Sequence, residues 1–267
     1  MEAAAENHIG FVVLDRPNPL GGNRFEGQPE VEPQLVSLVS QFPITYVHGF
    51  TVGELARFLN EEGLLKNGIR CDLTVVKMKG WKRKMNFEAT GLPWVISSPH
   101  VPHARTAYFY AMSGILGELY SFNIGVGYTL PFELFAAQWV DAEKLAANLN
   151  GLQLPGVRFR PIHYKPYYGA QKDVYLHGVQ TYITDTEKLP LTLIQFYVMQ
   201  ECYRLHPDRN VFELCDPSRL NMFDKVCGTG RVREAFTRDF TVESMESIWN
   251  QGVEGFKKKA KTYFLYK

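Results

Sequence analysis

The sequence is poor in cysteine, in net charge and in long apolar runs, and each shortage excludes a class of protein. Its four cysteines, Cys71, Cys202, Cys215 and Cys227, form neither a CxxC motif nor the spacing of a His/Cys metal site. We therefore expect buried free thiols and no metal site. A disulfide between Cys215 and Cys227 is the alternative. A net charge of +1 gives no electrostatic case for nucleic acid as a partner. No apolar run approaches the roughly 20 residues that span a bilayer, and no signal peptide is evident.

The composition that is present is that of an ordinary globular protein. Hydrophobic residues make up 45% and charged residues 21%, and 267 residues allow one large domain or two smaller ones. Aromatic residues reach 13%, which suits a sugar-binding cleft but equally suits a core or an interface.

An apolar run close to the start of the chain is its most informative local feature. Residues 9–14 (IGFVVL) predict a strand that is buried on both faces in the middle of an α/β sheet. Ligands in such sheets bind beyond the carboxyl ends of the strands, where Asp15, Arg16 and Asn18 follow here. The alternative is a turn in which Asp15 pairs with Arg16 and Asn18 bonds its own backbone. Residues 2–8 resemble the last turns of a helix, so we expect the chain to enter a domain already under way, with an exposed apolar surface beside the strand that favours a homodimer.

The remaining pattern predicts alternating helices and strands. Thr51 and Glu54 form a capping box before an apolar stripe, and Asp141 is a second N-cap. A glycine-bearing stretch near residue 125 marks a domain boundary, giving domains 1–124 and 125–267. We expect helices at 51–62, 103–120, 141–149, 190–205, 219–226, 231–238 and 241–260, and further strands at 69–78, 157–164 and 174–184.

Several isolated side chains are candidates for chemistry, each with a structural alternative. His48 follows a strand-like stretch and could act as an acid, a base or a sugar ligand, or could be structural. Trp81 and Trp94 lie at strand ends, where they could stack on a sugar or anchor a loop. Glu133 begins a stretch that we expect to be helical. It could be an acidic residue of the first turn, where the helix dipole favours negative charge, or a carboxylate of the site. A glycosidase usually needs two carboxylates, and Asp15, Glu54, Glu118 and Glu133 are available.

Taken in order, a set of motifs resembles the NamZ-type exo-β-N-acetylmuramidases, long catalogued as a bacterial domain of unknown function. The motifs are LDRPNPLGG at 14–22, HG at 48–49 with TVGELA at 51–56, MKGW at 78–81, TGLPW at 90–94, SPHVP at 98–102, GYT at 127–129 with PFE at 131–133, LPGV at 154–157 with FRP at 159–161, and YFLY at 263–266. The resemblance covers essentially the whole chain.

The resemblance implies a glycoside hydrolase of peptidoglycan turnover that releases terminal N-acetylmuramic acid. It implies a Rossmann-like N-terminal domain followed by a C-terminal α/β (α+β) domain, no cofactor, and a secreted or periplasmic full-length protein. It also implies that Asp15, Arg16, Asn18, His48, Trp81 and Glu133 line or support the sugar cleft. We expect Trp81 or Tyr128 to stack on the sugar ring, so the predicted substrate-binding residues are Asp15, Arg16, Asn18, His48, Trp81, Tyr128 and Glu133.

Two departures from the family pattern matter. Family members begin before the first residue of this sequence, and the resemblance implies that a PEHGF motif and a further Asp in that preceding segment supply the catalytic carboxylates. Nothing here matches the motif, so we expect these residues upstream of Met1 and leave the catalytic residues unassigned. Ile124 and Val126 stand where many relatives carry Glu and Arg. The alternative function is a cell-wall carbohydrate-binding domain without catalysis.

Overall fold

The computed structural model describes residues 1–169 and 171–267 and has an α/β fold. The chain forms two compact units. The first comprises Met1–Pro29, Ile44–Trp94 and Gly252–Lys267, and the second comprises Glu30–Pro43 and Val95–Gln251. The domain boundary expected at residue 125 stays a prediction. Within the described residues, no helix combines the length and hydrophobicity needed to cross a membrane.

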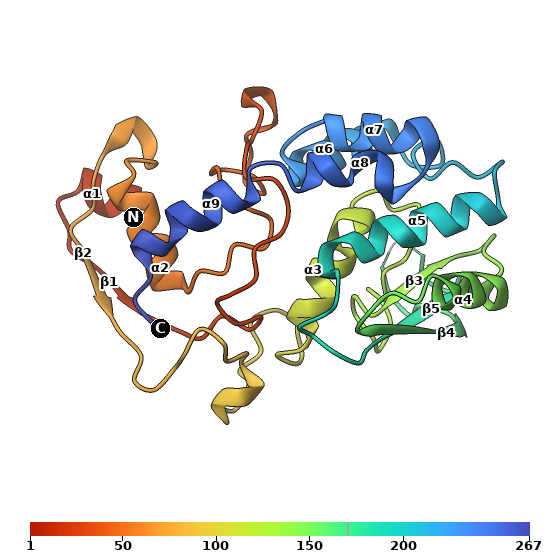
Figure 1. The fold of residues 1–267 in the computed structure, drawn as a ribbon, viewed down its shortest axis with the longest axis horizontal. Helices are drawn as coiled ribbons and strands as arrows, with labels where there is room; N and C mark the ends of the chain where they lie inside the picture. The colour runs from red at the N-terminus through yellow and green to blue at the C-terminus, as the bar shows by residue number, and fades with distance from the viewer. Residues whose placement is uncertain (170) are drawn as a thin grey trace. The chain divides into compact units, whose positions relative to one another are not determined.

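The first unit is built around a short parallel sheet and one well-formed helix (Figure 1). Its α-helices and strands are α1 (Glu2–Glu6), β1 (Phe11–Leu14), α2 (Val52–Glu61), β2 (Leu73–Val76) and α9 (Val253–Ala260). Short 3₁₀ turns lie at Lys66–Gly68, Glu88–Thr90 and Lys261–Tyr263. Strand β1 pairs with β2 in register from Phe11↔Leu73 to Leu14↔Val76, so both carboxyl ends lie at one edge.

The expectation that the first strand is buried on both faces is wrong. Its side chains alternate: Val13 is buried, whereas Val12 and Leu14 are 60% and 69% exposed. Strand β2 alternates in the same way, with Val76 exposed. The reason is that α2 packs against one face of this two-stranded sheet and the described residues leave the other face open. The apolar surface expected beside the strand is therefore present; the homodimer stays a prediction.

Aromatic packing joins α2 to the end of the chain. Phe58 of α2 contacts Phe256 of α9 and Tyr263 with ring centroids 5.7 and 5.2 Å apart, and Phe50 lies beside them. The single helix expected at 241–260 is two helices, because the backbone turns at Gly252, whose φ is +78°. A side chain is strained at that φ, whereas glycine is not.

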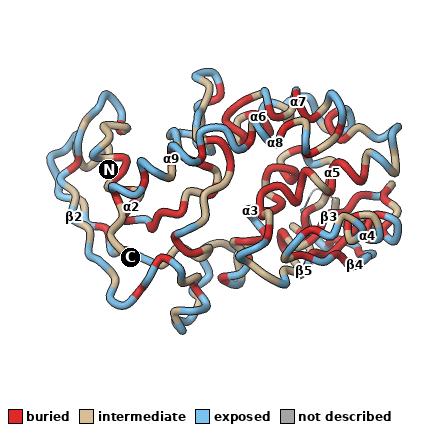
Figure 2. The backbone as a smooth tube through the Cα atoms, in the orientation of Figure 1, coloured by how far each residue is buried: buried red, intermediate tan, exposed pale blue. Residues whose placement is uncertain are grey.

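The second unit combines an antiparallel sheet with several helices. Its helices are α3 (Thr106–Gly117), α4 (Ala142–Gly151), α5 (Ile194–Leu205), α6 (Pro217–Cys227), α7 (Arg231–Asp239) and α8 (Val242–Trp249), with 3₁₀ turns at Pro33–Leu35 and Leu191–Leu193. The strands β3 (Leu134–Ala137), β4 (Val157–Tyr164) and β5 (Leu176–Ile183) have the order β3-β5-β4. Asp141 caps α4 as expected, accepting a bond from the amide of Lys144. Figure 2 shows how strongly α3 and α5 are buried in this unit.

The helix expected after Glu133 is instead strand β3. All four of its residues are buried, so it lacks the alternation that marks a half-exposed strand. Its pairing with β5, from Leu134↔Gln180 to Ala137↔His177, settles its structure. All four cysteines are free thiols, and Cys215 alone among them is not fully buried.

Candidate functional site

The strand-end cluster predicted from the sequence surrounds a cavity in the first unit. Asp15, Arg16 and Pro17 continue from β1, and Met78 to Trp81 follow β2. With Phe87 and Leu92 from the next loop, they line a cavity of about 640 Å³. Because parallel strands end at one edge, two stretches some 60 residues apart in sequence meet there. Three predicted site residues, Asp15, Arg16 and Trp81, line this cavity.

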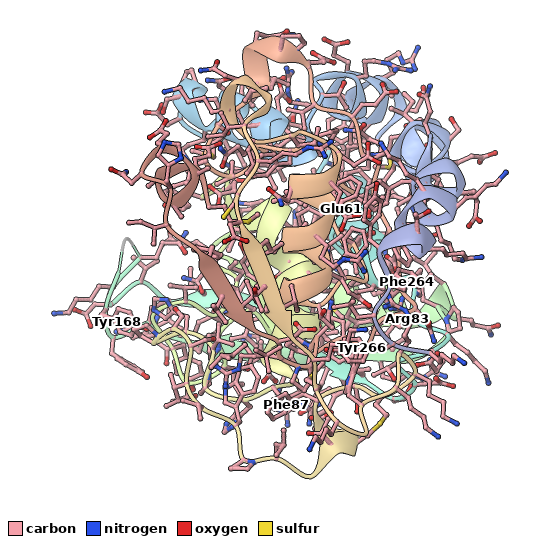
Figure 3. All side chains as sticks on the ribbon, turned by 90° about the vertical axis from the view of Figure 1, so that its left-hand side faces the viewer. Glu61, Arg83, Phe87, Tyr168, Phe264 and Tyr266 are labelled. Carbon is pink, nitrogen blue, oxygen red and sulfur yellow. The ribbon has the colours of Figure 1, made fainter. Side chains whose placement is uncertain are left out.

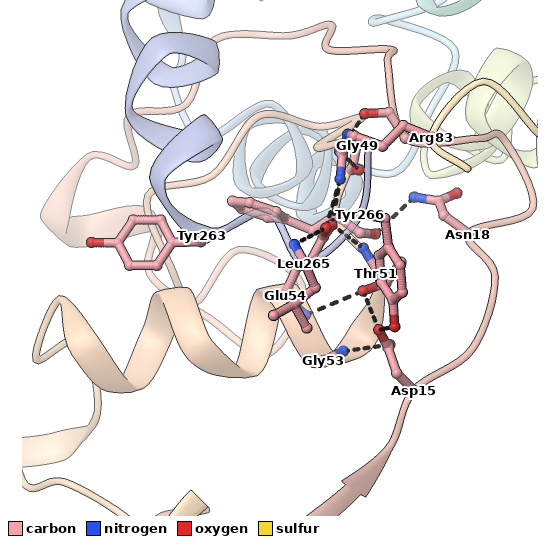
Figure 4. A network of polar contacts seen from close by, with 12 residues as sticks. Asp15, Asn18, Gly49, Thr51, Gly53, Glu54, Arg83, Tyr263, Leu265 and Tyr266 are labelled. Carbon is pink, nitrogen blue, oxygen red and sulfur yellow. Dashed lines mark hydrogen bonds and ion pairs between the residues drawn. The ribbon is translucent and has the colours of Figure 1, made fainter. Parts of the chain in front are cut away.

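The carboxylate of Asp15 is fully used in holding the fold together (Figure 4). Its Oδ1 accepts from the backbone N–H groups of Arg16 and Gly53, at 2.9 and 2.8 Å. Its Oδ2 accepts from the hydroxyls of Thr51 at 2.8 Å and Tyr266 at 2.5 Å. Burial, followed by the bond to Asp15, raises the pKa of Tyr266, so this hydroxyl remains a donor. Asp15 therefore ties β1 to the start of α2 and to the end of the chain.

Gly53 permits this arrangement. A Cβ at this position would lie 2.5 Å from a methyl carbon of Val75 and 2.8 Å from the carboxyl carbon of Asp15. Both distances are shorter than carbon–carbon contacts allow, so no side chain fits while Asp15 sits on the first turn of α2.

The capping box predicted at Thr51 and Glu54 is confirmed. The Thr51 hydroxyl accepts from the Glu54 amide, and the Glu54 carboxylate accepts from the Thr51 amide. The same carboxylate is fully buried and pairs with Arg83, whose Nη1 lies 2.7 and 2.8 Å from its two oxygens. It also accepts from the amide of Leu265 at 2.8 Å. The role of Glu54 is therefore structural, as the capping-box pattern in the sequence predicts.

Arg83 is the residue that sequence reasoning missed. Its guanidinium donates to the carbonyls of Gly22 and Gly49 besides pairing with Glu54, and it stacks on Phe264 with 3.3 Å from Cζ to the ring centroid (Figure 3). Burial lowers the pKa of Arg83, and the bond to Glu54 acts against this. The basic run from 77 to 84 gives no sign that one of its members turns inward, because the partners are distant in sequence.

Asn18 and His48 lie in the same unit but are not among the residues that line the cavity. Asn18 donates to the carbonyl of Phe50 at 2.9 Å and accepts from the amide of Leu20 at 2.9 Å, so both ends of its amide are engaged. His48 accepts from the Phe50 amide at Nδ1, at 3.1 Å. Burial lowers the pKa of His48 to about 4, so the ring is neutral and carries its proton on Nε2. That N–H has no partner among the described residues, which leaves it as a donor.

The two tryptophans of the first unit pack as loop anchors. Trp81 is 6% exposed and meets the ring of Tyr266 edge to face at 5.1 Å. Its Nε1 is buried and has no hydrogen-bond partner among the described residues. Trp94 packs edge to face on Phe87 at 4.9 Å. Trp81 can thus present one edge of its ring to the cavity. The ring is too buried to offer an open face on which a sugar could stack.

Tyr128 and Glu133 belong to the second unit. The ring of Tyr128 lies 4.7 Å from that of Tyr164 and packs against the apolar cluster around β3. Burial raises the pKa of Glu133, and this effect exceeds the opposing effects of Arg105, Gln180 and His103. Glu118, the other candidate carboxylate of this unit, is bound to Arg219 at 2.5 Å.

The glycine segment of the second unit forms tight turns. Gly125 and Gly127 have φ of +87° and +94°, and a Cβ at either would collide with a backbone carbonyl, of Leu130 or of Tyr168. Ile124 and Val126 line a separate cavity of about 440 Å³ together with aromatic side chains. In the described part of the chain, no group of three His, Cys, Asp or Glu side chains is arranged to hold a metal ion.

The fold and the site define an α/β protein with a ligand-sized cavity at the carboxyl ends of parallel strands, and comparison with known proteins identifies its family. Residues 1–105 and 108–266 match the family models for the N-terminal and C-terminal parts of the exo-β-N-acetylmuramidase NamZ. The chain therefore belongs to the NamZ family, as its motifs predict.

Three relatives illustrate the match. The peptidoglycan β-N-acetylmuramidase NamZ of Bacillus subtilis (strain 168) is 40% identical over 266 residues, covering 100% of this chain and 62% of that protein. The chain thus spans less than two thirds of that relative's length. The crystal structure of a DUF1343 family protein from Bacteroides fragilis NCTC 9343 is 54% identical, with a TM-score of 0.96 over 100% of this chain and 69% of the other. A second DUF1343 structure from the same organism, 24% identical with a TM-score of 0.74 and the same coverage, shares the fold.

Proposed function

We propose that this chain is part of an exo-acting glycoside hydrolase that releases terminal N-acetylmuramic acid from peptidoglycan fragments. The observation that carries the proposal is the match to both NamZ family models along the chain. The cavity at the ends of β1 and β2 supports it, because it is large enough for a sugar residue and lies where α/β sheets bind ligands. The residues proposed to bind the substrate, or to position the groups that bind it, remain Asp15, Arg16, Asn18, His48, Trp81, Tyr128 and Glu133.

The roles of these residues differ. Asp15 and Asn18 act as positioning residues, since their polar atoms are engaged within the protein. His48 offers an Nε2 hydrogen that suits a sugar hydroxyl or a carboxylate. Glu133 is the proposed proton-holding group, because burial raises its pKa towards the range in which a carboxyl group can act as an acid.

We further propose that at least one of the two carboxylates that cleave the bond lies outside these 267 residues. Of the four candidates, Asp15 accepts four bonds, Glu54 is buried against Arg83, and Glu118 pairs with Arg219. A glycosidase usually needs two available carboxylates, and this leaves Glu133 as one. We also propose that the full-length protein acts outside the cytoplasm, where its polymer lies; fractionation of cells that express it would test this, and recovery in the cytoplasm would contradict it.

A chromogenic β-N-acetylmuramide tests the function. We expect slow or no hydrolysis by the 267-residue chain and rapid hydrolysis by a form extended at its N-terminus with the residues encoded upstream. If neither form hydrolyses the substrate, the proposed hydrolase activity is contradicted. The second candidate, a carbohydrate-binding domain, is favoured by the engagement of Asp15 and Glu54 in the fold, and hydrolysis by the short chain would exclude it.

A further inference from the structure

The loop that follows β2 concentrates positive charge beside the cavity. The run 77–84 (KMKGWKRK) contains five cations, whereas the whole chain has a net charge of only +1. Arg83 turns inward to Glu54, but the four lysines are exposed. None of those lysines forms an ion pair among the residues that the structure describes. The loop that supplies residues 78–81 to the cavity is therefore richer in positive charge than the protein as a whole.

Two cations line the cavity itself, one from each strand end. Arg16 follows β1 and Lys79 follows β2, and both are exposed. Neither side chain has an ion pair or hydrogen bond among residues 1–169 and 171–267, since only the backbone N–H of Arg16 contacts Asp15. The lining carboxylate, that of Asp15, already accepts four hydrogen bonds and pairs with neither. Among the described residues, the cavity thus presents two cationic side chains without an ion-pair partner, and the one carboxylate in its lining is held by other donors.

The rest of the cavity wall is largely apolar. Met78, Met85, Phe87, Leu92 and the buried ring of Trp81 contribute to it. A wall of this kind beside two cations suits a ligand that carries a carboxylate next to a methyl group. A neutral sugar hydroxyl would leave both charges uncompensated, whereas a carboxylate accepts from a guanidinium in a forked geometry.

We propose that Arg16 and Lys79 form a subsite for the carboxylate of an acidic ether substituent on the substrate sugar, with the methyl group of that substituent against the apolar wall. This inference rests on the proposed function and deepens it, because it names the feature that distinguishes N-acetylmuramic acid from N-acetylglucosamine. Arg16 and Lys79 are specificity-determining residues in this proposal, and no bond is made or broken there.

Binding to the 267-residue chain tests the subsite without requiring hydrolysis. The probes are the methyl β-glycosides of N-acetylmuramic acid, of its neutral lactyl amide and of N-acetylglucosamine, titrated by calorimetry or by NMR. We expect Arg16→Gln with Lys79→Gln to weaken binding of the acid at least about tenfold and to change the two neutral sugars little, as loss of a charge-assisted bond predicts. Lys84→Gln is the matched control, because Lys84 is an exposed lysine of the same run that does not line the cavity.

The outcomes separate the subsite from the proposed function. Equal weakening for all three probes, or an unchanged preference for the acid, would overturn the subsite even if an extended form hydrolyses N-acetylmuramides. If the wild type prefers the acid over the two neutral sugars and the double variant does not, the subsite is supported even if no form is a hydrolase. A wild type that binds acid and amide equally would overturn it directly.

Discussion

The buried pair Glu54–Arg83 should be the most sensitive point of the first unit. Glu54→Gln keeps the shape of the side chain but removes the negative charge that faces Arg83 at 2.7 and 2.8 Å. Both partners are buried, at 0% and 5% exposure, so the guanidinium would stay buried beside the carbonyls of Gly22 and Gly49 and the Phe264 ring without its counter-charge. Breaking a buried pair by removing one partner costs about 3–5 kcal/mol.

The measurement must report on one unit, because the chain contains two. Hydrogen exchange of the α2 amides, followed by mass spectrometry, does so. A loss of about 3 kcal/mol corresponds to exchange that is about a hundredfold faster. The amides of α5, in the other unit, serve as an internal reference.

Glu61→Gln is the matched control on the same helix. Glu61 is exposed and pairs with Arg57 at 3.0 Å in an i,i+4 arrangement, which contributes about 0.3–0.5 kcal/mol. We expect this variant to change α2 exchange about twofold. If Glu54→Gln were no more damaging than Glu61→Gln, the assignment of Glu54 and Arg83 as the centre of this unit would be refuted.

Three other predictions follow from the contacts described. Gly53→Ala should destabilise the first unit and lower its unfolding midpoint in urea, because a methyl group displaces the Asp15 carboxylate; an unchanged midpoint would contradict the close approach. The pKa of His48 is about 4 in the fold and 6.5 in an unfolded chain, so stability that is complete above pH 6.5 should fall by up to about 3 kcal/mol as the pH drops to 4. His48→Asn should flatten that part of the urea-stability profile, whereas the exposed His8→Asn should not. The raised pKa of Glu133 means that the folded state disfavours its charge, so Glu133→Gln should stabilise the second unit at neutral pH and lose this advantage at acid pH; equal effects at both would contradict the shift.

Local signals in the sequence were sufficient for part of the fold. The capping box at Thr51 and Glu54 and the N-cap at Asp141 are confirmed because their partners lie three residues away. The strand expected at 157–164 matches β4 residue for residue, since alternation survives wherever one face of a strand is exposed. The polar ends of the first two strands meet at one cavity, as parallel pairing requires.

Other features depend on contacts that no local pattern contains. Strand β3 is buried throughout, so its sequence has no period of two. The exposed face of β1 reflects which elements cover the sheet, and apolar content alone could not show that. Arg83 and Tyr266 are separated from Glu54 and Asp15 by 29 and 251 residues, so their pairing appears only once the chain has folded.

These distant contacts change how the strand-end cluster should be understood. The residue types at Asp15 and Glu54 suggested catalytic carboxylates, but the end of the chain donates to both, through Tyr266 and Leu265. A carboxylate that already accepts bonds from several fixed donors is poor as a nucleophile or as a base, because a substrate would have to displace them. Arg16 and Lys79, the cations at the same edge, have no such partners for their side chains in the part of the chain that the structure describes. The first unit is therefore the place to test recognition of a charged sugar, and Glu133 is the described carboxylate to test for a role in cleavage.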